Sequence, residues 1–227
     1  MLFRRVIQKL SRDHGWVFLN KKDFEPNSEY FSKIYQNKMF GRSESVSGPG
    51  SDLKATIAIR NVIPKLIRSL EICNVVDVPC GDMFWFSKLD LEDIEYLGLD
   101  IVPELISILR AKYPKHDFDV LDATKSITPK ADLIICRDLL VHLTNQQAVT
   151  VIENFKKSGS KFLLTTSFTE TKLNQELIVP KVGVGWRPLN LAIAPFNLGS
   201  PLQLINEQSS EGRGKFKDKS LALWQLN

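Results

Sequence analysis

The sequence predicts an α/β fold: a mostly parallel sheet with a C-terminal antiparallel hairpin and an N-terminal helical extension. Three observations predict it. Short apolar runs alternate with segments of helical periodicity between residues 74 and 167, a rhythm that favours right-handed crossovers between parallel strands. The length of 227 residues suits one domain with appendages, and 43% apolar residues supply a sizeable core. This composition excludes a disordered or collagen-like chain.

The N-terminal 22 residues hold the excess positive charge of the chain. Six Lys or Arg stand there against one acid, while the remaining residues are nearly neutral. Residues 2–12 place apolar and basic side chains on opposite helical faces, which predicts a short amphipathic helix. Residues 1–22 either contact an anionic membrane face or an acidic partner, or pack on their own domain. Because the body carries no net positive charge, nucleic acid is disfavoured as a partner.

A Gly/Ser-rich stretch over residues 40–51 predicts a loop. It is either a linker or a working loop whose Ser45, Ser47 or Ser51 closes over a ligand carboxylate. We place the boundary between the N-terminal extension (1–51) and the main domain (52–227) at its end.

A helix is expected over residues 53–70, with Ser51 or Asp52 as its cap and Pro64 bending or dividing it. Seven apolar runs then predict the strands of the sheet. Residues 168–200 have no clear period, and a Gly-rich loop joins the last two strands. The expected strands are 74–79, 95–101, 117–121, 131–136, 161–167, 202–206 and 220–226, and the further helices are 83–88, 103–113 and 145–157.

The cysteines predict neither a disulfide framework nor a zinc site. Cys73, Cys80 and Cys136 are odd in number and lack Cys-x-x-Cys spacing, so we expect no metal and a reducing compartment. No apolar run reaches the roughly 18 residues that a membrane span needs, and the N-terminus lacks the apolar stretch of a secretory signal. We therefore expect a cytoplasmic protein.

Acidic residues stand at the carboxyl ends of the expected strands, where open parallel sheets bind ligands. Asp77 begins a turn in which Gly81 allows close backbone approach, and Asp100 follows the second strand at a spacing suited to a ribose diol. Asp122 follows the third strand. Each has a structural alternative, because Asp77 could hold its own loop and Asp122 could cap a turn. Their conjunction predicts a nucleoside-type cofactor.

The first turn has one glycine where a G-x-G-x-G run has three, because Pro79 and Met83 occupy the outer positions. A pyrophosphate needs close backbone approach and a helix N-terminus, so the loss of two glycines weakens a dinucleotide interpretation. The pattern favours S-adenosylmethionine over NAD.

Three runs then carry a resemblance to a known family. V-V-D-V-P-C-G-D at 75–82, L-G-L-D-I-V-P-E-L-I at 97–106 and D-L-I-I-C-R-D-L-L-V-H-L at 132–143 resemble class I S-adenosylmethionine-dependent methyltransferases. That family has a Rossmann-like, seven-stranded sheet ending with one antiparallel strand. Together with E-S-V-S-G-P-G-S at 44–51 and W-R-P-L-N-L at 186–191, these runs are similar to a group of small microbial methyltransferase-like proteins. The resemblance covers about residues 52–227 and implies a methyltransferase.

The resemblance also assigns the parts of the cofactor. Asp77 and Gly81 would line its methionine end, and Asp100 would hold the ribose hydroxyls. Ile101 would pack on the adenine, whose amino group would donate to Asp122. The expected cofactor-binding set is Asp77, Pro79, Gly81, Asp100, Ile101, Asp122, Ala123 and Arg137.

Methyl transfer from a sulfonium is an in-line displacement, so a hydroxyl acceptor needs a base. If a helical turn begins at Asp138, His142 shares its face, and we expect His142, or failing it Asp138, to be that base. Alternatively, His142 fills a partly buried surface beside Leu139 and Leu143. Arg137 either binds an anionic substrate group or pairs with Asp138. The run here is not N-P-P-Y-like, so a base amine is disfavoured as substrate.

The irregular stretch before the hairpin is expected to build the acceptor site. Trp186, Arg187, Asn190 and Asn197 offer an aromatic face and polar donors that suit a glycosidic or other polyhydroxylated acceptor, although Trp186 could instead be core. We therefore expect methyl transfer to oxygen of a small molecule or glycan. The alternatives are an NAD-dependent oxidoreductase and a methyltransferase-fold binding protein without turnover.

Overall fold

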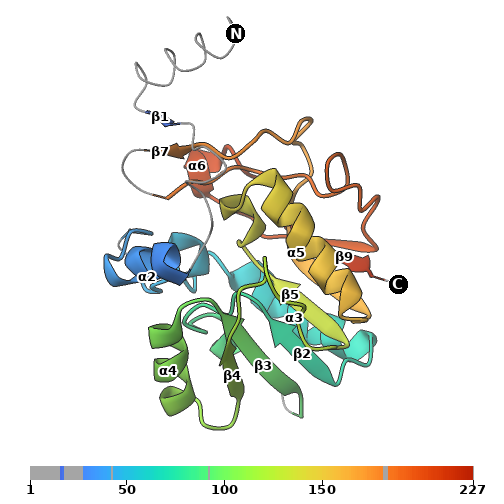
Figure 1. The fold of residues 1–227 in the computed structure, drawn as a ribbon. Helices are drawn as coiled ribbons and strands as arrows, with labels where there is room; N and C mark the ends of the chain where they lie inside the picture. The colour runs from blue at the N-terminus through green and yellow to red at the C-terminus, as the bar shows by residue number, and fades with distance from the viewer. Residues whose placement is uncertain (1–15, 18–27, 42, 92, 181–183, 227) are drawn as a thin grey trace, which may run out of the picture.

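The computed structural model describes residues 16–17, 28–41, 43–91, 93–180 and 184–226. A seven-stranded sheet in the order β4-β3-β2-β5-β6-β9-β8 forms its centre (Figure 1). A separate two-stranded ribbon pairs β1 (Trp16–Val17) with β7 (Val179–Pro180). The strands of the main sheet are β2 (Asn74–Asp77), β3 (Glu95–Asp100), β4 (Asp117–Val120), β5 (Leu133–Cys136), β6 (Phe162–Phe168), β8 (Gln203–Asn206) and β9 (Lys219–Gln225).

The sheet is parallel except for β9. Strand β2 pairs in parallel with β3 and β5, β3 with β4, and β5 with β6. Strand β9 runs antiparallel to both β6 and β8 and lies between them. This confirms the predicted mostly parallel sheet with a closing antiparallel hairpin. Because the chain moves outward from β2 to β4 and then returns to β5, the strand order reverses between β2 and β5, where such sheets bind ligands.

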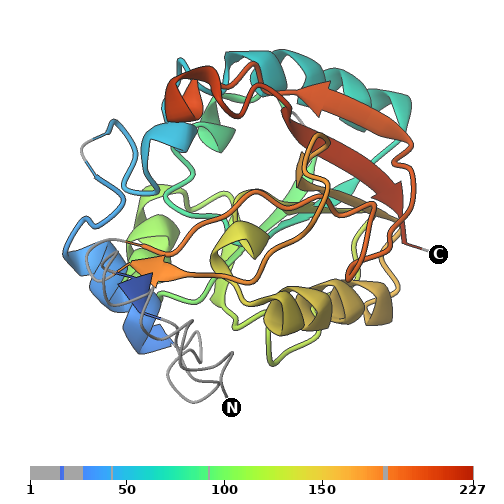
Figure 2. The same ribbon diagram turned by 90° about the horizontal axis from the view of Figure 1, so that it is seen from above.

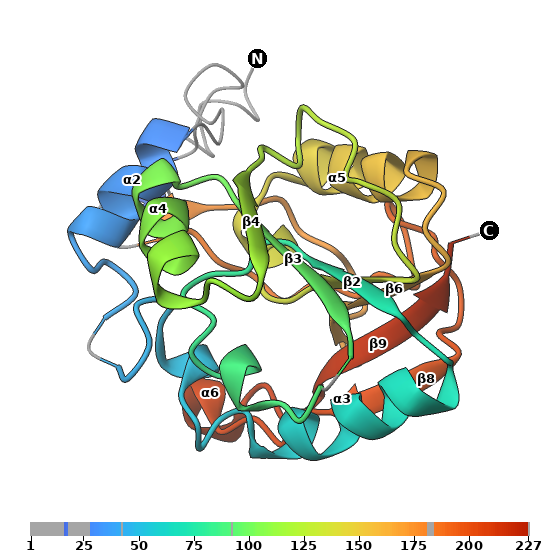
Figure 3. The same ribbon diagram turned by 90° about the horizontal axis from the view of Figure 1, so that it is seen from below.

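Helices cover both faces of the sheet (Figures 2 and 3). Side chains alternate along each strand, so Val75 of β2 packs in one buried apolar cluster with α3 and α4, while Val76 packs in another with α5. The helices are α2 (Ser28–Gln36), α3 (Ile57–Ser69), α4 (Pro103–Lys112), α5 (Asn145–Lys157) and the short α6 (Glu211–Gly214), with 3₁₀ turns η1 (Pro49–Ser51), η2 (Phe86–Lys88) and η3 (Leu140–His142).

Helix α5 has the bounds expected from its sequence, because Thr144 and Gln147 form a reciprocal capping box at its start. The expected helix at 83–88 is wrong except for the single turn η2. Met83 has a φ of 55°, a left-handed conformation that cannot open an α-helix, so the helix cannot begin there.

Helix α3 differs from its expected bounds and caps. It begins at Ile57 after Thr56, so neither Ser51 nor Asp52 caps it, and it runs unbroken through Pro64. Asp52 instead accepts a hydrogen bond from the backbone N–H of Glu44. No helix of the described residues is long and apolar enough to cross a membrane. The expected helix at 2–12 lies outside the described residues.

Candidate functional site

A cavity opens at the carboxyl ends of β2, β3 and β5, at the reversal of the strand order. Segments from four parts of the chain enclose it: α2 with the loop that follows, the turn after β2, the turn after β3, and the turn after β5. The volume of this cavity is about 130 Å³. Its lining comprises Phe31, Tyr35, Phe40, Val46, Ser47, Ser51, Asp77, Pro79, Cys80, Gly81, Asp82, Trp85, Asp100, Ile101, Val102, Leu105, Arg137, Asp138, Leu139 and His142.

The turn after β2 brings backbone against the cavity at Gly81. Gly81 has a φ of 53°, which favours glycine, and a Cβ there would meet the Ser47 hydroxyl. Its N–H donates to the Asp100 carboxylate over 3.2 Å, so the turns after β2 and β3 are joined directly. The single glycine that remains in the turn therefore stands where both conformation and space require it.

Asp77 and Asp100 are two buried carboxylates of this cavity. Asp77 accepts a hydrogen bond from the Tyr96 hydroxyl at 2.9 Å, and Asp100 also accepts one from the N–H of Val102 at 3.1 Å. Burial raises the pKa of Asp77 to about 7 and that of Asp100 to about 6, although these hydrogen bonds oppose the shift. The donors are neutral, so a ligand that brings positive charge or hydroxyl donors would favour the ionised carboxylates.

A smaller cavity adjoins the first beside β3 and β4, and the two share five lining residues: Phe31, Pro79, Asp100, Ile101 and Leu139. Asp122 and Ala123 line only the smaller cavity. Asp122 also caps its own turn, because its carboxylate accepts the N–H of Thr124 at 3.0 Å. Asp122 therefore caps its own turn and also lines a cavity, while its contact with an adenine stays a prediction.

The segment from residue 43 to 52, called the serine loop below, packs over the turn after β2. The Ser45 hydroxyl and the Val46 N–H donate to the Asp82 carboxylate at 2.8 and 2.9 Å. Within this loop the Ser45 side chain is buried, whereas Ser47 and Ser51 line the cavity. The serine loop is thus a wall of the site and not a linker.

Arg137, at the end of β5, is held by the protein itself. Its Nε and one terminal nitrogen donate to the Glu207 carboxylate at 3.2 and 2.6 Å, and the same terminal nitrogen donates to the Gly50 carbonyl at 2.7 Å. The other terminal nitrogen lies 3.5 Å from Asp138. Arg137 therefore has two carboxylate partners, of which Asp138 is the more distant. Its main ion pair, with Glu207, was missed by sequence reasoning.

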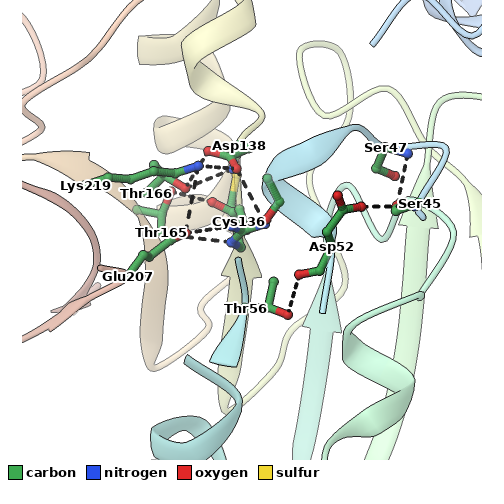
Figure 4. A network of polar contacts seen from close by, with 12 residues as sticks. Ser45, Ser47, Asp52, Thr56, Cys136, Asp138, Thr165, Thr166, Glu207 and Lys219 are labelled. Atoms are coloured by element: carbon green, nitrogen blue, oxygen red, sulfur yellow. Dashed lines mark hydrogen bonds and ion pairs between the residues drawn. The ribbon is translucent and has the colours of Figure 1, made fainter. Parts of the chain in front are cut away.

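Asp138 has no helical turn at its position, contrary to expectation. Its φ of 58° is left-handed, and the 3₁₀ turn η3 begins only at Leu140. Lys219 of β9 contacts the Asp138 carboxylate at 2.8 Å (Figure 4). Burial opposes ionisation of Asp138, but Lys219 and Arg137 outweigh it and hold its pKa below the ordinary range. Such a carboxylate is a weak proton acceptor.

His142 lines the cavity in a form suited to accept a proton. Its Nδ1 lies 2.6 Å from the Gly185 carbonyl, which can only accept, so Nδ1 carries the hydrogen and Nε2 keeps a lone pair in the neutral ring. Burial lowers the pKa of His142 more than Gly185 and Asp138 raise it. The Phe40 ring packs edge-on against the imidazole at 5.5 Å between centroids.

Arg187 lies outside both cavities. Its guanidinium is buried and donates to the carbonyls of Gln175 at 2.9 Å and Val141 at 3.1 Å, and to the Asn145 side chain at 2.8 Å. This geometry gives no support to the prediction that Arg187 binds substrate, because its guanidinium is engaged within the chain and lines neither cavity. Arg187 holds the turn η3, which carries His142, against the chain that precedes the hairpin.

The other expected acceptor residues also fail to line either cavity. Trp186 packs edge-on against Phe168 and Phe216, with ring centroids 5.6 and 4.7 Å apart, and so is a packing residue. The Asn190 side chain donates to backbone carbonyls, and Asn197 is exposed on a turn. The cavity is instead lined by three aromatic side chains that precede residue 52, where we placed the start of the main domain: Phe31, Tyr35 and Phe40.

The comparisons with known proteins agree with this geometry. No family model matches the chain, and no curated protein sequence matches it. Its structure is similar to magnesium protoporphyrin IX methyltransferase from Synechocystis with bound S-adenosylmethionine, at a TM-score of 0.57 and 13% identity over 91% of this chain and 99% of that chain. It is also similar to the N-methyltransferase NodS from Bradyrhizobium japonicum with S-adenosylhomocysteine, at 0.59 and 14% over 86% and 97%.

A third similar structure is a didemethyltoxoflavin N1-methyltransferase from Burkholderia thailandensis, at a TM-score of 0.57 and 12% identity over 87% of this chain and 86% of that chain. Likenesses at such low identity show the fold. The chain therefore has the Rossmann-like fold of class I S-adenosylmethionine-dependent methyltransferases, as its sequence motifs predict.

Proposed function

We propose that the chain is an S-adenosylmethionine-dependent methyltransferase acting on a hydroxyl oxygen of a small molecule, with His142 as the base. One observation carries the proposal. Two buried carboxylates with raised pKa values, Asp77 and Asp100, join the glycine turn around one cavity at the reversal of the strand order. Similar folds crystallised with a cofactor hold S-adenosylmethionine or S-adenosylhomocysteine, which does not favour the NAD-dependent alternative.

The residues present fit this cofactor. Asp100 would accept from the ribose hydroxyls, and Ile101 and Asp122, which line the smaller cavity, would contact the adenine. Asp77 and Gly81 would hold the methionine end, where the buried carboxylate suits an ammonium or sulfonium charge. When bound, the cofactor supplies an electrophilic methyl group on a positively charged sulfur.

The role of His142 follows from its tautomer. With Nδ1 held by the Gly185 carbonyl, Nε2 accepts the proton of the acceptor hydroxyl while the oxygen gains the methyl group. Its lowered pKa keeps the ring neutral and competent at neutral pH. Asp138 does not replace it in this proposal, because Lys219 and Arg137 lower the pKa of that carboxylate and make it a weak proton acceptor.

We do not propose a glycan as the methyl acceptor. The side chains expected to bind it lie off the cavity, whereas Phe31, Tyr35, Phe40 and Leu139 give the cavity an apolar wall beside His142. Such a wall favours a small acceptor with an apolar or aromatic body carrying the hydroxyl. The Arg137 charge is matched by Glu207, so the anionic acceptor group considered for Arg137 is not proposed either.

Two measurements test the proposal. In calorimetric titrations with S-adenosylmethionine, S-adenosylhomocysteine and NAD, we expect micromolar binding of the first two and none of NAD; the reverse pattern would overturn it. A screen with tritiated-methyl cofactor over small-molecule extracts should then label a product that is lost in His142→Ala. Cofactor binding with no labelled product in any extract would favour a binding protein without turnover.

A further inference from the structure

We infer that Glu207 and Arg137 are positioning residues through which the C-terminal hairpin latches the serine loop over the cofactor cavity. The inference rests on the proposed function for the identity of the ligand, but the latch itself concerns contacts within the chain. It replaces the expected role of Arg137 as a ligand of the substrate with a role in holding the wall of the site.

The latch is a chain of short contacts between segments distant in sequence. Glu207, which follows β8, binds two nitrogens of Arg137, and Arg137 donates in turn to the carbonyl of Gly50 at 2.7 Å. Glu207 and Arg137 are almost fully buried, with side-chain exposures of 2% and 4%. Figure 4 shows Glu207, Asp138 and Lys219 on one side of this network and the serine loop on the other.

Charges in the network balance. Arg137 and Lys219 face Glu207 and Asp138, and Lys219 lies 2.8 Å from Asp138 and 3.8 Å from Glu207. Removal of one charge from such a buried set leaves another uncompensated, so the set holds its geometry tightly. The planar guanidinium binds a carboxylate with two nitrogens and still reaches a carbonyl, which a lysine ammonium cannot reproduce.

Contacts along its whole length hold the serine loop in place. Asp82 binds its first half through Ser45 and Val46, Ser47 rests on Gly81, and Arg137 holds its second half at Gly50. At the end of the loop, the Asp52 carbonyl also accepts a hydrogen bond from the Thr56 hydroxyl, but Arg137 is what joins the second half of the loop to the end of β5. Since Ser47 and Ser51 line the cavity, release of the second half would open the wall at the end expected to hold the methionine.

Hydrogen exchange and calorimetry on the full chain test the latch. In Glu207→Gln and in Arg137→Lys we expect amides of residues 43–52 to exchange at least 10-fold faster than in the wild type, while amides of β2 and β6 keep their protection. The dissociation constant of S-adenosylhomocysteine should rise about 10-fold in both. Glu153→Gln, which removes an exposed ion pair with Lys156 on α5, serves as the matched control and should change neither measurement.

The outcomes separate the latch from the proposed function. Unchanged exchange of residues 43–52 in both variants would overturn the latch, as would a loss of protection spread evenly over the sheet, which marks a general stability element. If the wild type binds no S-adenosylhomocysteine, the proposed function fails, yet the exchange measurement still decides the latch. Faster loop exchange with unchanged affinity would overturn the claim that the latch positions the cofactor site.

Discussion

Aspartates on the two sides of the carboxyl-terminal edge of the sheet have pKa values shifted in opposite directions. On the side of β2 and β3, burial of Asp77 and Asp100 outweighs their neutral hydrogen-bond donors and, for Asp77, the charge of Arg137, so their pKa values are raised. On the side of β5 and β9, Lys219 and Arg137 supply the opposite charge, and the pKa of Asp138 is lowered. The difference lies in where the compensating charge comes from.

A carboxylate compensated within the chain belongs to the framework of the site. A buried carboxylate without a close cation is costly when ionised, and proteins retain such groups where a ligand completes them. In the proposed function the cofactor is therefore assigned to the β2 and β3 side, while the β5 and β9 side would hold the serine loop and the proposed base, His142, in position. Five predictions test this contrast, in order of decreasing effect.

His142→Ala should reduce the turnover number by about 1,000-fold, because general base catalysis is worth roughly 10²–10⁴-fold. The affinity for S-adenosylhomocysteine, measured by calorimetry, should stay within about threefold, since the base does not hold the cofactor. His116→Ala, at an exposed position before β4, is the control. Full turnover in His142→Ala would show that His142 is not the base and that the β5 side does not hold one.

Asp100→Asn should weaken S-adenosylmethionine binding by about 30-fold. The change keeps the shape of the side chain but replaces hydrogen bonds to a charged acceptor, worth about 2 kcal/mol, by neutral ones. Asp119→Asn, in an exposed ion pair with Arg110, is the matched control and should bind like the wild type. Equal binding by both variants would show that the Asp100 carboxylate only holds the turn after β2 and does not bind the cofactor.

The affinity for S-adenosylmethionine should rise about fivefold between pH 6 and pH 8. Burial raises the pKa of Asp77 to about 7 in the absence of ligand, and a cationic ligand binds better to the ionised form, so binding strengthens as pH rises through that value. S-adenosylhomocysteine, which lacks the sulfonium charge, should show a smaller increase. Calorimetry across this range on the wild type and on Asp77→Asn, where the dependence should flatten, is the measurement.

The same carboxylate affects stability without cofactor. Because the pKa of Asp77 is higher in the folded chain than in the unfolded chain, where it is near 4, the folded state binds the proton more tightly. Stability of the cofactor-free protein should therefore fall as pH rises from about 4 to about 7. Melting temperatures that rise over that interval in the wild type relative to Asp77→Asn would contradict the assignment.

Lys219→Met should produce the smallest effect, a shift of the acid limb of the pH-rate profile to higher pH. The positive charges of Lys219 and Arg187 lower the pKa of His142, while the negative charge of Asp138 raises it. Loss of Lys219 therefore raises the pKa of His142, and the ring loses its lone pair to protonation at a higher pH. A limb that stays in place would show that Asp138 and Lys219 do not act on the base.

The sequence by itself determined the sheet and the glycine turn. Alternating apolar runs set each strand, and the turns after β2 and β3 lie at the carboxyl ends of neighbouring parallel strands, so Asp77, Gly81 and Asp100 had to meet. These features depend on residues close in sequence or on strand order, which periodicity reveals. The helix expected at Met83 failed because one left-handed residue overrides local propensity.

Only the tertiary structure decided which charges are compensated. Arg137 and Glu207 are 70 positions apart, and Lys219 and Asp138 are 81 apart, so no local pattern pairs them. They meet because β9 inserts beside β6 and carries Lys219 to the carboxyl end of β5. The pKa of a carboxylate depends on its desolvation and on charges within a few ångströms, and both are properties of the packed chain. The acids of the site are therefore visible in the sequence, while the fold decides which of them have their charge compensated within the chain.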